Sequence, residues 1–159
     1  MDPIKDFAQM TAYLQSLSGR KKVVVVCPND PHTEYAILRA LEEGIAEFIL
    51  VADCKFLSRA EEIKNSYPQY VEILVTSSPD EAAALAVQLI RQNKADILMK
   101  GLINTDNLLR AVLNKEKGIL PRGEVLTHVT VARVPVYPKL LVFSDAAVIP
   151  RPTLEQFKA

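Results

Sequence analysis

Four consecutive valines near the start of the chain constrain its fold more than any other feature. Val23–Val26 is an unbroken β-branched run between Lys22 and Cys27. A strand with one wet face alternates apolar and polar residues, whereas a continuous apolar run is typical of a strand buried on both faces. Such strands belong to parallel sheets with helices above and below, so this run predicts an α/β protein.

Strand and helix signals alternate along the first 118 residues, with turn residues such as Gly44 between them. This order predicts a mostly parallel, doubly wound sheet with helices on both faces. The expected helices are 7–17, 32–43, 55–65, 79–91 and 105–116, and the expected strands are 22–27, 47–52, 71–75 and 96–99.

The character of the sequence changes after Gly118. Two strand-like runs, 126–134 and 139–144, are joined by the short connection Pro135-Val136-Tyr137-Pro138. So short a link predicts a C-terminal antiparallel hairpin, because a parallel pair needs a long crossover. The last residues predict the start of a helix, with Thr153 as its cap and Gln156 at the capping-box position.

Composition narrows the possible partners. The 159 residues contain nineteen basic and nineteen acidic side chains, and 49% of residues are hydrophobic. This balance predicts a globular protein of one domain that binds neither nucleic acid nor a membrane. The absence of a signal-peptide core predicts a cytoplasmic protein. Cys27 and Cys54 lack metal-ligand spacing, which predicts free thiols packed as small hydrophobes and no metal site.

The first candidate site is the turn after the strand at 96–99. Lys100 and Gly101 follow that strand, and Asn104 and Thr105 open the next helix. A cation, a glycine that admits close approach and free helix N–H groups are what a phosphate needs. The alternative is that Lys100 faces solvent, Gly101 forms a turn and the helix has a routine cap. Asn104 can either cap the helix or contribute its side chain to a ligand.

Two further segments end at sheet edges. The loop from Cys27 to His32 follows the first strand but lacks GxGxxG, and the favoured reading is a turn at Asn29-Asp30 with Pro31 opening a helix. His128 precedes the hairpin and Asp145 follows it. A histidine and an aspartate at one edge can act as acid and base, although such pairs are more often structural.

Four ordered segments carry a resemblance to a known family: Leu98-Met99-Lys100-Gly101-Leu102-x-x-Thr105, Leu108–Glu116, Thr127-His128-Val129 and Phe143-Ser144-Asp145-Ala146-Ala147. The Lys22–Cys27 strand and the segment Gly44–Val51 also agree with it. Together they resemble the phosphate acetyl/butyryltransferase family, most closely its butyryltransferase branch, over nearly the whole chain. The ending, Ile149-Pro150-Arg151-Pro152-Thr153, is more similar to the acetyltransferase branch.

The resemblance implies an enzyme that transfers an acyl group between coenzyme A and inorganic phosphate, giving acyl phosphate. It implies a fold like the first domain of isocitrate/isopropylmalate dehydrogenases, a homodimer or larger assembly, and coenzyme A as a substrate with no tightly bound cofactor. The phosphate-binding residues would be Lys100, Gly101, Asn104 and Thr105. His128 and Asp145 would be supporting residues of the same cleft wall.

Members of this family are about twice as long, so residues 1–159 are expected to form the N-terminal domain of a two-domain acyltransferase. The main catalytic residues are then expected in the second half, and the isolated chain is expected to be inactive or weakly active. The alternatives are a non-catalytic α/β module for small-molecule binding or assembly, and a flavodoxin-like domain. Strand order alone supports the last of these only weakly.

Overall fold

The computed structural model describes residues 4–121, 123–144, 151, 153 and 154. These residues fall into two compact units, and the first consists of Leu17–Ile119. Met1–Ser16 and Leu120–Ala159 together make the second unit. The expected capping of a terminal helix by Thr153 and Gln156 lies largely outside the described residues. The assignment of the whole chain to a single domain stays a prediction.

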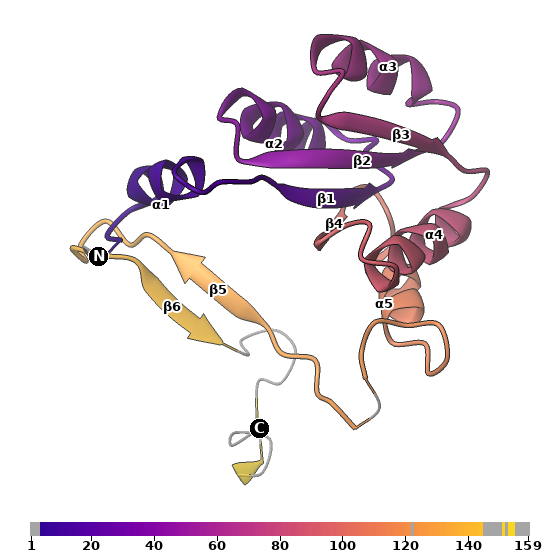
Figure 1. Cartoon of the computed structure of the whole chain (residues 1–159). Helices are drawn as coiled ribbons and strands as arrows, with labels where there is room; N and C mark the ends of the chain where they lie inside the picture. The colour runs from indigo at the N-terminus through magenta and orange to yellow at the C-terminus, as the bar shows by residue number, and fades with distance from the viewer. Residues whose placement is uncertain (1–3, 122, 145–150, 152, 155–159) are drawn as a thin grey trace. The chain divides into compact units, whose positions relative to one another are not determined.

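A four-stranded parallel sheet forms the centre of the Leu17–Ile119 unit (Figure 1). Its strands lie in the order β3-β2-β1-β4, so the chain runs outward from β1 to β3 and then returns to place β4 on the other side of β1. The strands are β1 (Lys21–Val26), β2 (Ala46–Ala52), β3 (Val71–Val75) and β4 (Ile97–Lys100).

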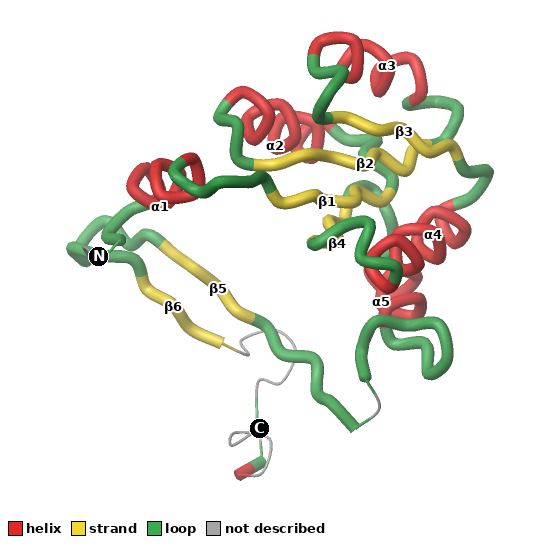
Figure 2. The backbone as a smooth tube through the Cα atoms, in the orientation of Figure 1, coloured by secondary structure: helices red, strands yellow, loops and turns green. Residues whose placement is uncertain are grey.

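Helices cover both faces of this sheet, as Figure 2 shows. The valines of β1 divide between the two faces: Val23 and Val25 pack with the first pair of helices, and Val24 and Val26 pack with the second. The continuous apolar run is therefore explained by burial on both faces. The helices are α2 (Pro31–Glu42) and α3 (Leu57–Ser66) on one face, and α4 (Pro79–Arg91) and α5 (Thr105–Val112) on the other.

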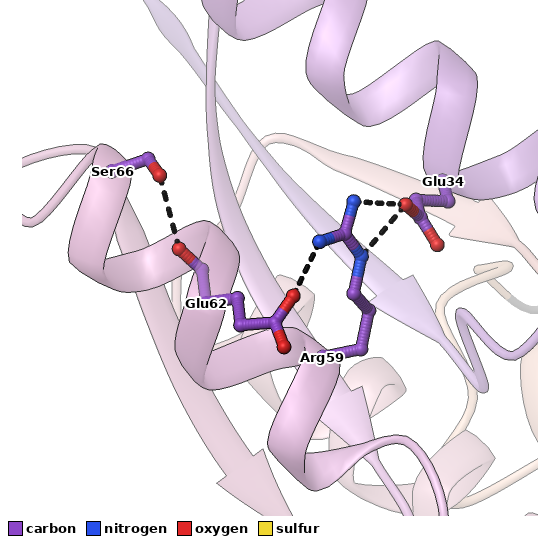
Figure 3. A network of polar contacts seen from close by, with 4 residues as sticks. All are labelled: Glu34, Arg59, Glu62 and Ser66. Carbon is purple, nitrogen blue, oxygen red and sulfur yellow. Dashed lines mark hydrogen bonds and ion pairs between the residues drawn. The ribbon is translucent and has the colours of Figure 1, made fainter.

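A polar network ties α2 to α3 on their shared face (Figure 3). The Arg59 guanidinium on α3 donates from Nε to Glu34 of α2 over 2.8 Å and also bonds Glu62 one turn along its own helix. Ser66 Oγ donates to the Glu62 carbonyl over 3.1 Å. Because these side chains are partly exposed, the network aligns the helices more than it stabilises them.

The second unit contains α1 (Phe7–Gln15) and an antiparallel hairpin. Asp6 caps α1 by accepting a hydrogen bond from the Gln9 N–H over 2.8 Å. The hairpin strands are β5 (Val129–Ala132) and β6 (Leu141–Ser144). The expected mostly parallel sheet, with helices on both faces and an antiparallel hairpin, is confirmed.

Two sequence-based expectations need correction. The helix expected at 105–116 ends at Val112, because the Asn114 side chain accepts hydrogen bonds from Glu116 N and Lys117 N and forms a turn. Cys27 is a buried free thiol as expected, but Cys54 is exposed, because it lies in the turn between β2 and α3. Its thiol does not pack in the core.

Candidate functional site at the carboxyl edge of the sheet

The return of the chain from β3 to β4 creates a topological switch point between β1 and β4. The two strands are in register, with Val26 beside Lys100. The loop that leaves β1 at Cys27 therefore lies next to the loop that leaves β4 at Gly101. In open α/β sheets, ligands bind at the carboxyl ends of the strands at such a point.

Backbone contacts join these two loops. Gly101 N donates to the Val26 carbonyl over 2.9 Å, and Leu102 N donates to the Cys27 carbonyl over 2.7 Å. Cys27 has a φ of +53°, an uncommon left-handed conformation for a residue with a side chain. This conformation directs the Cys27 carbonyl toward the second loop.

Only glycine fits at position 101. A Cβ there would lie 2.3 Å from the Cys27 carbonyl oxygen and 2.8 Å from that of Val26. Both are backbone atoms in hydrogen-bonded positions, so neither can move aside as a flexible side chain does. Gly101 thus permits the close approach that sets the path of the chain from β4 into α5.

Lys100 supplies positive charge at this turn. Its side chain donates to the Gly101 carbonyl over 3.3 Å, so the ammonium group lies against the turn. Among the described residues it forms no ion pair. The amino-edge lysines behave differently: Lys21 pairs with Asp96 over 3.3 Å, and Lys22 pairs with Glu47 over 3.5 Å.

The start of α5 contributes backbone donors. Asn104 is the N-cap, and its side chain accepts a hydrogen bond from Asp106 N over 3.0 Å. Its observed contact is therefore the capping one. In the described structure, the N–H groups of Thr105 and Asn107 have no acceptor, as expected in a first helical turn. These two N–H groups and the Lys100 ammonium are three donors for an anion.

Two carboxylates near the start of α5 repel an anion electrostatically. Asp106 lies in the first turn of α5. Asp80, at the start of α4, accepts a hydrogen bond of 2.6 Å from the Asn107 side-chain amide. The turn is therefore electrostatically mixed, and Lys100 is needed to make it attractive to phosphate.

The loop from Cys27 to His32 forms the turn that the sequence favoured. Asp30 caps α2 by accepting hydrogen bonds from His32 N and Thr33 N, and Pro31 occupies the first helical position. The Thr33 hydroxyl donates to the other carboxylate oxygen over 2.5 Å, and these bonds hold the pKa of Asp30 below its usual value. The Asp30 carboxylate is occupied by helix capping.

The expected pair at the hairpin is only partly described. Val129 lies opposite Ser144 in the register, and His128 directly precedes Val129 at this end of the hairpin. His128 is half-buried, with Nε2 3.3 Å from the Thr130 hydroxyl. Asp145 lies outside the described residues. His128 belongs to the second unit and Lys100 to the Leu17–Ile119 unit.

A cavity of about 420 Å³ at the carboxyl edge was missed by sequence reasoning. The loops after β1, β2 and β4 and the first residue of α4 contribute to it. Its polar side chains follow β1 and β2 without any motif, but the sequence Asp53-Cys54-Lys55 directly after a buried strand was an available signal. The lining residues are Cys27, Asn29, Asp53, Lys55, Phe56, Pro79 and Leu102.

The described residues contain no cluster of three histidine, cysteine or acidic side chains able to hold a metal ion. No helix among them is long and apolar enough to cross a bilayer.

The switch point of this open α/β sheet thus carries a lysine and a helix start whose donors form a candidate anion site. Residues 71–159 match the model of the phosphate acetyl/butaryl transferase family, and the chain belongs to this family. The chain is 38% identical to phosphate butyryltransferase of Clostridium beijerinckii over 90% of its length and 47% of the relative's. It is 33% identical to phosphate acetyltransferase of Thermotoga maritima, covering 86% of the chain and 46% of that protein.

A solved structure shares the fold. The branched-chain phosphotransacylase of Enterococcus faecalis superposes with a TM-score of 0.66 at 23% identity, over 86% of this chain and 46% of that one. The chain thus spans about half the length of the relatives it matches. The expected family is confirmed, whereas the likeness to isocitrate/isopropylmalate dehydrogenases stays a prediction.

Proposed function

We propose that the chain takes part in phosphate acyl transfer, the reaction of an acyl-coenzyme A with inorganic phosphate to give acyl phosphate and free coenzyme A. Membership of the phosphate acetyl/butaryl transferase family supports this proposal. The single observation that carries it is the β4–α5 turn at the switch point, where the Lys100 ammonium is followed within one short turn by the N–H groups at the start of α5.

In the proposed site, Lys100 and the N–H groups of Thr105 and Asn107 bind phosphate oxygens. Gly101 allows the β4–α5 turn to pack against the Cys27 backbone, and Asn104 caps α5, which fixes the residue at which the helix begins. One phosphate oxygen attacks the thioester carbonyl carbon, forming a C–O bond. The C–S bond breaks, and the sulfur leaves with the electron pair and takes up the proton lost by phosphate.

We assign no general base to this turn, because Lys100 is cationic and Asn104 and Thr105 are neutral. Membership of the family is our ground for proposing His128 and Asp145 as supporting residues of the reaction. It also supports a two-domain enzyme of which residues 1–159 form the first domain, an assembly of two or more copies, coenzyme A as a substrate and a cytoplasmic location. These assignments are part of the proposal.

The test is an acyl-transfer assay on the whole polypeptide that the gene encodes. Butyryl-coenzyme A and acetyl-coenzyme A are each mixed with phosphate, free thiol is measured with a chromogenic disulfide, and acyl phosphate is trapped as the hydroxamate. Phosphate-dependent formation of both products is expected. Thiol release without hydroxamate, or no release with either acyl group, would refute acyl transfer and favour the non-catalytic binding module.

A further inference from the structure

A cavity of about 630 Å³ lies between the second half of α4 and the segment in which α5 ends. It has the volume of a small-molecule site. Its lining residues lie within 84–92 and 111–117, outside the β4–α5 turn and outside the loop after β1. This cavity is therefore separate from the proposed phosphate site, and the acyl-transfer proposal does not use it.

The α4 wall of the cavity follows one face of the helix. Residues three, four and seven positions apart lie in a row on a helix, and a row of seven residues is about 10 Å long. The row begins with small apolar side chains, of which Val87 is buried, and it ends with a cation. Its members are Ala84, Val87, Gln88 and Arg91.

The opposite wall includes a turn whose shape is fixed by its own hydrogen bonds. The Asn114 Oδ1 atom accepts hydrogen bonds from Glu116 N over 3.0 Å and from Lys117 N over 2.9 Å. Gly118 N donates to the Asn114 carbonyl over 2.8 Å, and a Cβ at Gly118 would lie 2.3 Å from the Val112 carbonyl oxygen. The turn therefore holds the backbone of Lys117, a lining residue, in a defined position.

Arg91 joins the two walls. Its Nη1 atom donates to the Glu116 carbonyl over 3.0 Å, so the guanidinium lies against the peptide group that links Glu116 to Lys117. Arg91 and Lys117 thus belong to the same end of the cavity. The Nε and Nη2 atoms of Arg91 have no acceptor among the described residues. This edge of a guanidinium is one that binds a carboxylate through two parallel hydrogen bonds.

Neither cation is needed to complete a helix end. At the end of α4, Lys94 N donates to the Leu89 carbonyl over 2.9 Å across Asn93, which has a φ of +54°. Such a left-handed residue closes a helix through the backbone. Within the described part of the chain, Arg91 and Lys117 form no ion pair. Both cations are therefore available to a ligand.

The polar end of the cavity carries a net positive charge. Both α4 and α5 end beside it, and a helix C-terminus carries about half a negative charge. Arg91 and Lys117 supply two positive charges, and among the described residues the lining contains no carboxylate, although Glu116 adjoins it. The other polar lining residues have amide groups that can donate to an anion: Gln88, Gln92 and Asn114.

We propose that this cavity binds a medium-chain carboxylic acid as its anion. The carboxylate lies on the free edge of Arg91 and beside Lys117, and the hydrocarbon chain runs along α4 over Val87 to Ala84. Ala111 of α5 belongs to the lining of the facing wall and is also small and apolar. The proposal rests on this lining and does not depend on acyl transfer at the β4–α5 turn.

The test is calorimetric titration of the 159-residue chain with octanoate, acetate, 1-octanol and inorganic phosphate. One octanoate is expected to bind per chain, about tenfold more tightly than any of the other three, because each of them lacks the chain or the carboxylate. Equal binding of octanol would show apolar contact alone, and equal binding of acetate or phosphate would show charge alone. Either result, or no binding of octanoate, would overturn the proposal.

Variants at the polar end locate the carboxylate. Arg91→Met is expected to weaken octanoate binding about tenfold, and Lys117→Met about threefold, because each loses a charge-assisted contact. The matched controls are Arg110→Met and Lys115→Met, which remove exposed cations of the same region outside the lining. Circular dichroism confirms that each variant is folded, and Lys117→Met carries the test if Arg91→Met is not. Equal losses in the controls, or no loss at position 117, would contradict the pose.

A variant at the apolar end locates the chain. Ala84→Leu adds a larger side chain at an exposed helical position, which the helix tolerates because leucine is a good helix former. Octanoate is expected to bind about fivefold more weakly to this variant, whereas butanoate, which is too short to reach position 84, binds as it does to the unmodified chain. An unchanged octanoate affinity, or equal losses for both acids, would show that the chain does not run along α4.

Discussion

Lysines lie at both edges of the parallel sheet, but their side chains make different contacts at the two edges. At the amino edge, Lys21 pairs with Asp96, Lys22 pairs with Glu47, and the Lys22 N–H also donates to Asp96 over 2.9 Å. At the carboxyl edge, Lys55 and Lys100 have no ion pair among the described residues. Lys21 and Lys22 are thus paired within the fold, whereas Lys55 and Lys100 stay available to a ligand.

The largest expected effect tests how the carboxyl edge is built. Gly101→Ala places a Cβ 2.3 Å from the Cys27 carbonyl oxygen, so the two loops must separate. We expect the free energy of unfolding to fall by about 3 kcal/mol, as for overpacked positions. Urea unfolding measures this. Gly19→Ala is the control, because its Cβ meets nothing within 4 Å. Equal stability of the two variants would contradict the close contact.

The next effect compares the edges directly. Lys100→Met is expected to weaken phosphate binding about tenfold, because a charge-assisted hydrogen bond is lost. Lys21→Met, at the amino edge, is expected to leave phosphate binding unchanged, because Lys21 already pairs with Asp96. Calorimetric titration with phosphate at low salt gives both affinities. A similar loss in both variants would show a diffuse charge effect and no localised site.

A smaller effect concerns the cap that follows β1. Asp30→Ala is expected to lower the free energy of unfolding by about 1 kcal/mol, because the first N–H groups of α2 lose their acceptor. Asp30→Asn retains an acceptor and is the control.

The pKa of Asp30 is lowered in the fold, chiefly by the Thr33 hydroxyl, so ionisation of Asp30 stabilises the folded state. The stability that unmodified protein gains over Asp30→Asn is therefore present above pH 3.8 and is lost as the pH falls through the folded pKa. Urea unfolding at several pH values measures it. A difference that grows on acidification would contradict this sign.

The smallest expected effect is a gain in phosphate affinity. Asp106→Asn removes a carboxylate from the first turn of α5 and is expected to raise phosphate affinity about two- to fivefold, because an exposed charge at a helix start contributes little. Glu61→Gln on α3 removes the same charge far along the sequence and is the control. A loss of affinity in Asp106→Asn would mean that Asp106 supports the anion site instead of opposing it.

The fold could be predicted well from the sequence, because the local pattern of apolar and polar residues indicates which faces of each element are buried. The Val23–Val26 run predicted a strand covered on both faces, and the described ends of the core elements lie close to those expected. Failures occurred where a single side chain decides the outcome. Asn114 ends α5 early through its own hydrogen bonds, and the turn after β2 leaves Cys54 exposed.

The candidate site was predicted less completely for a physical reason. Lys100 and Gly101 could be placed at a strand end, because strand order shows which ends share an edge. The left-handed Cys27 and the contact that requires glycine at 101 depend on two loops more than seventy residues apart. The cavity lined by Asp53 and Lys55 depends on still more loops. The spacing of residues in the sequence does not show that these loops line one cavity.

The central claim is that phosphate binds at the β4–α5 turn. The most direct test is a phosphate titration followed by the backbone amide signals of the isotope-labelled chain. The account predicts that the signals of Gly101, Thr105 and Asn107 shift together with one dissociation constant, while those of Lys22 and Lys94 stay in place. Shifts centred on the amino edge, or no shift at the turn at saturating phosphate, would contradict it.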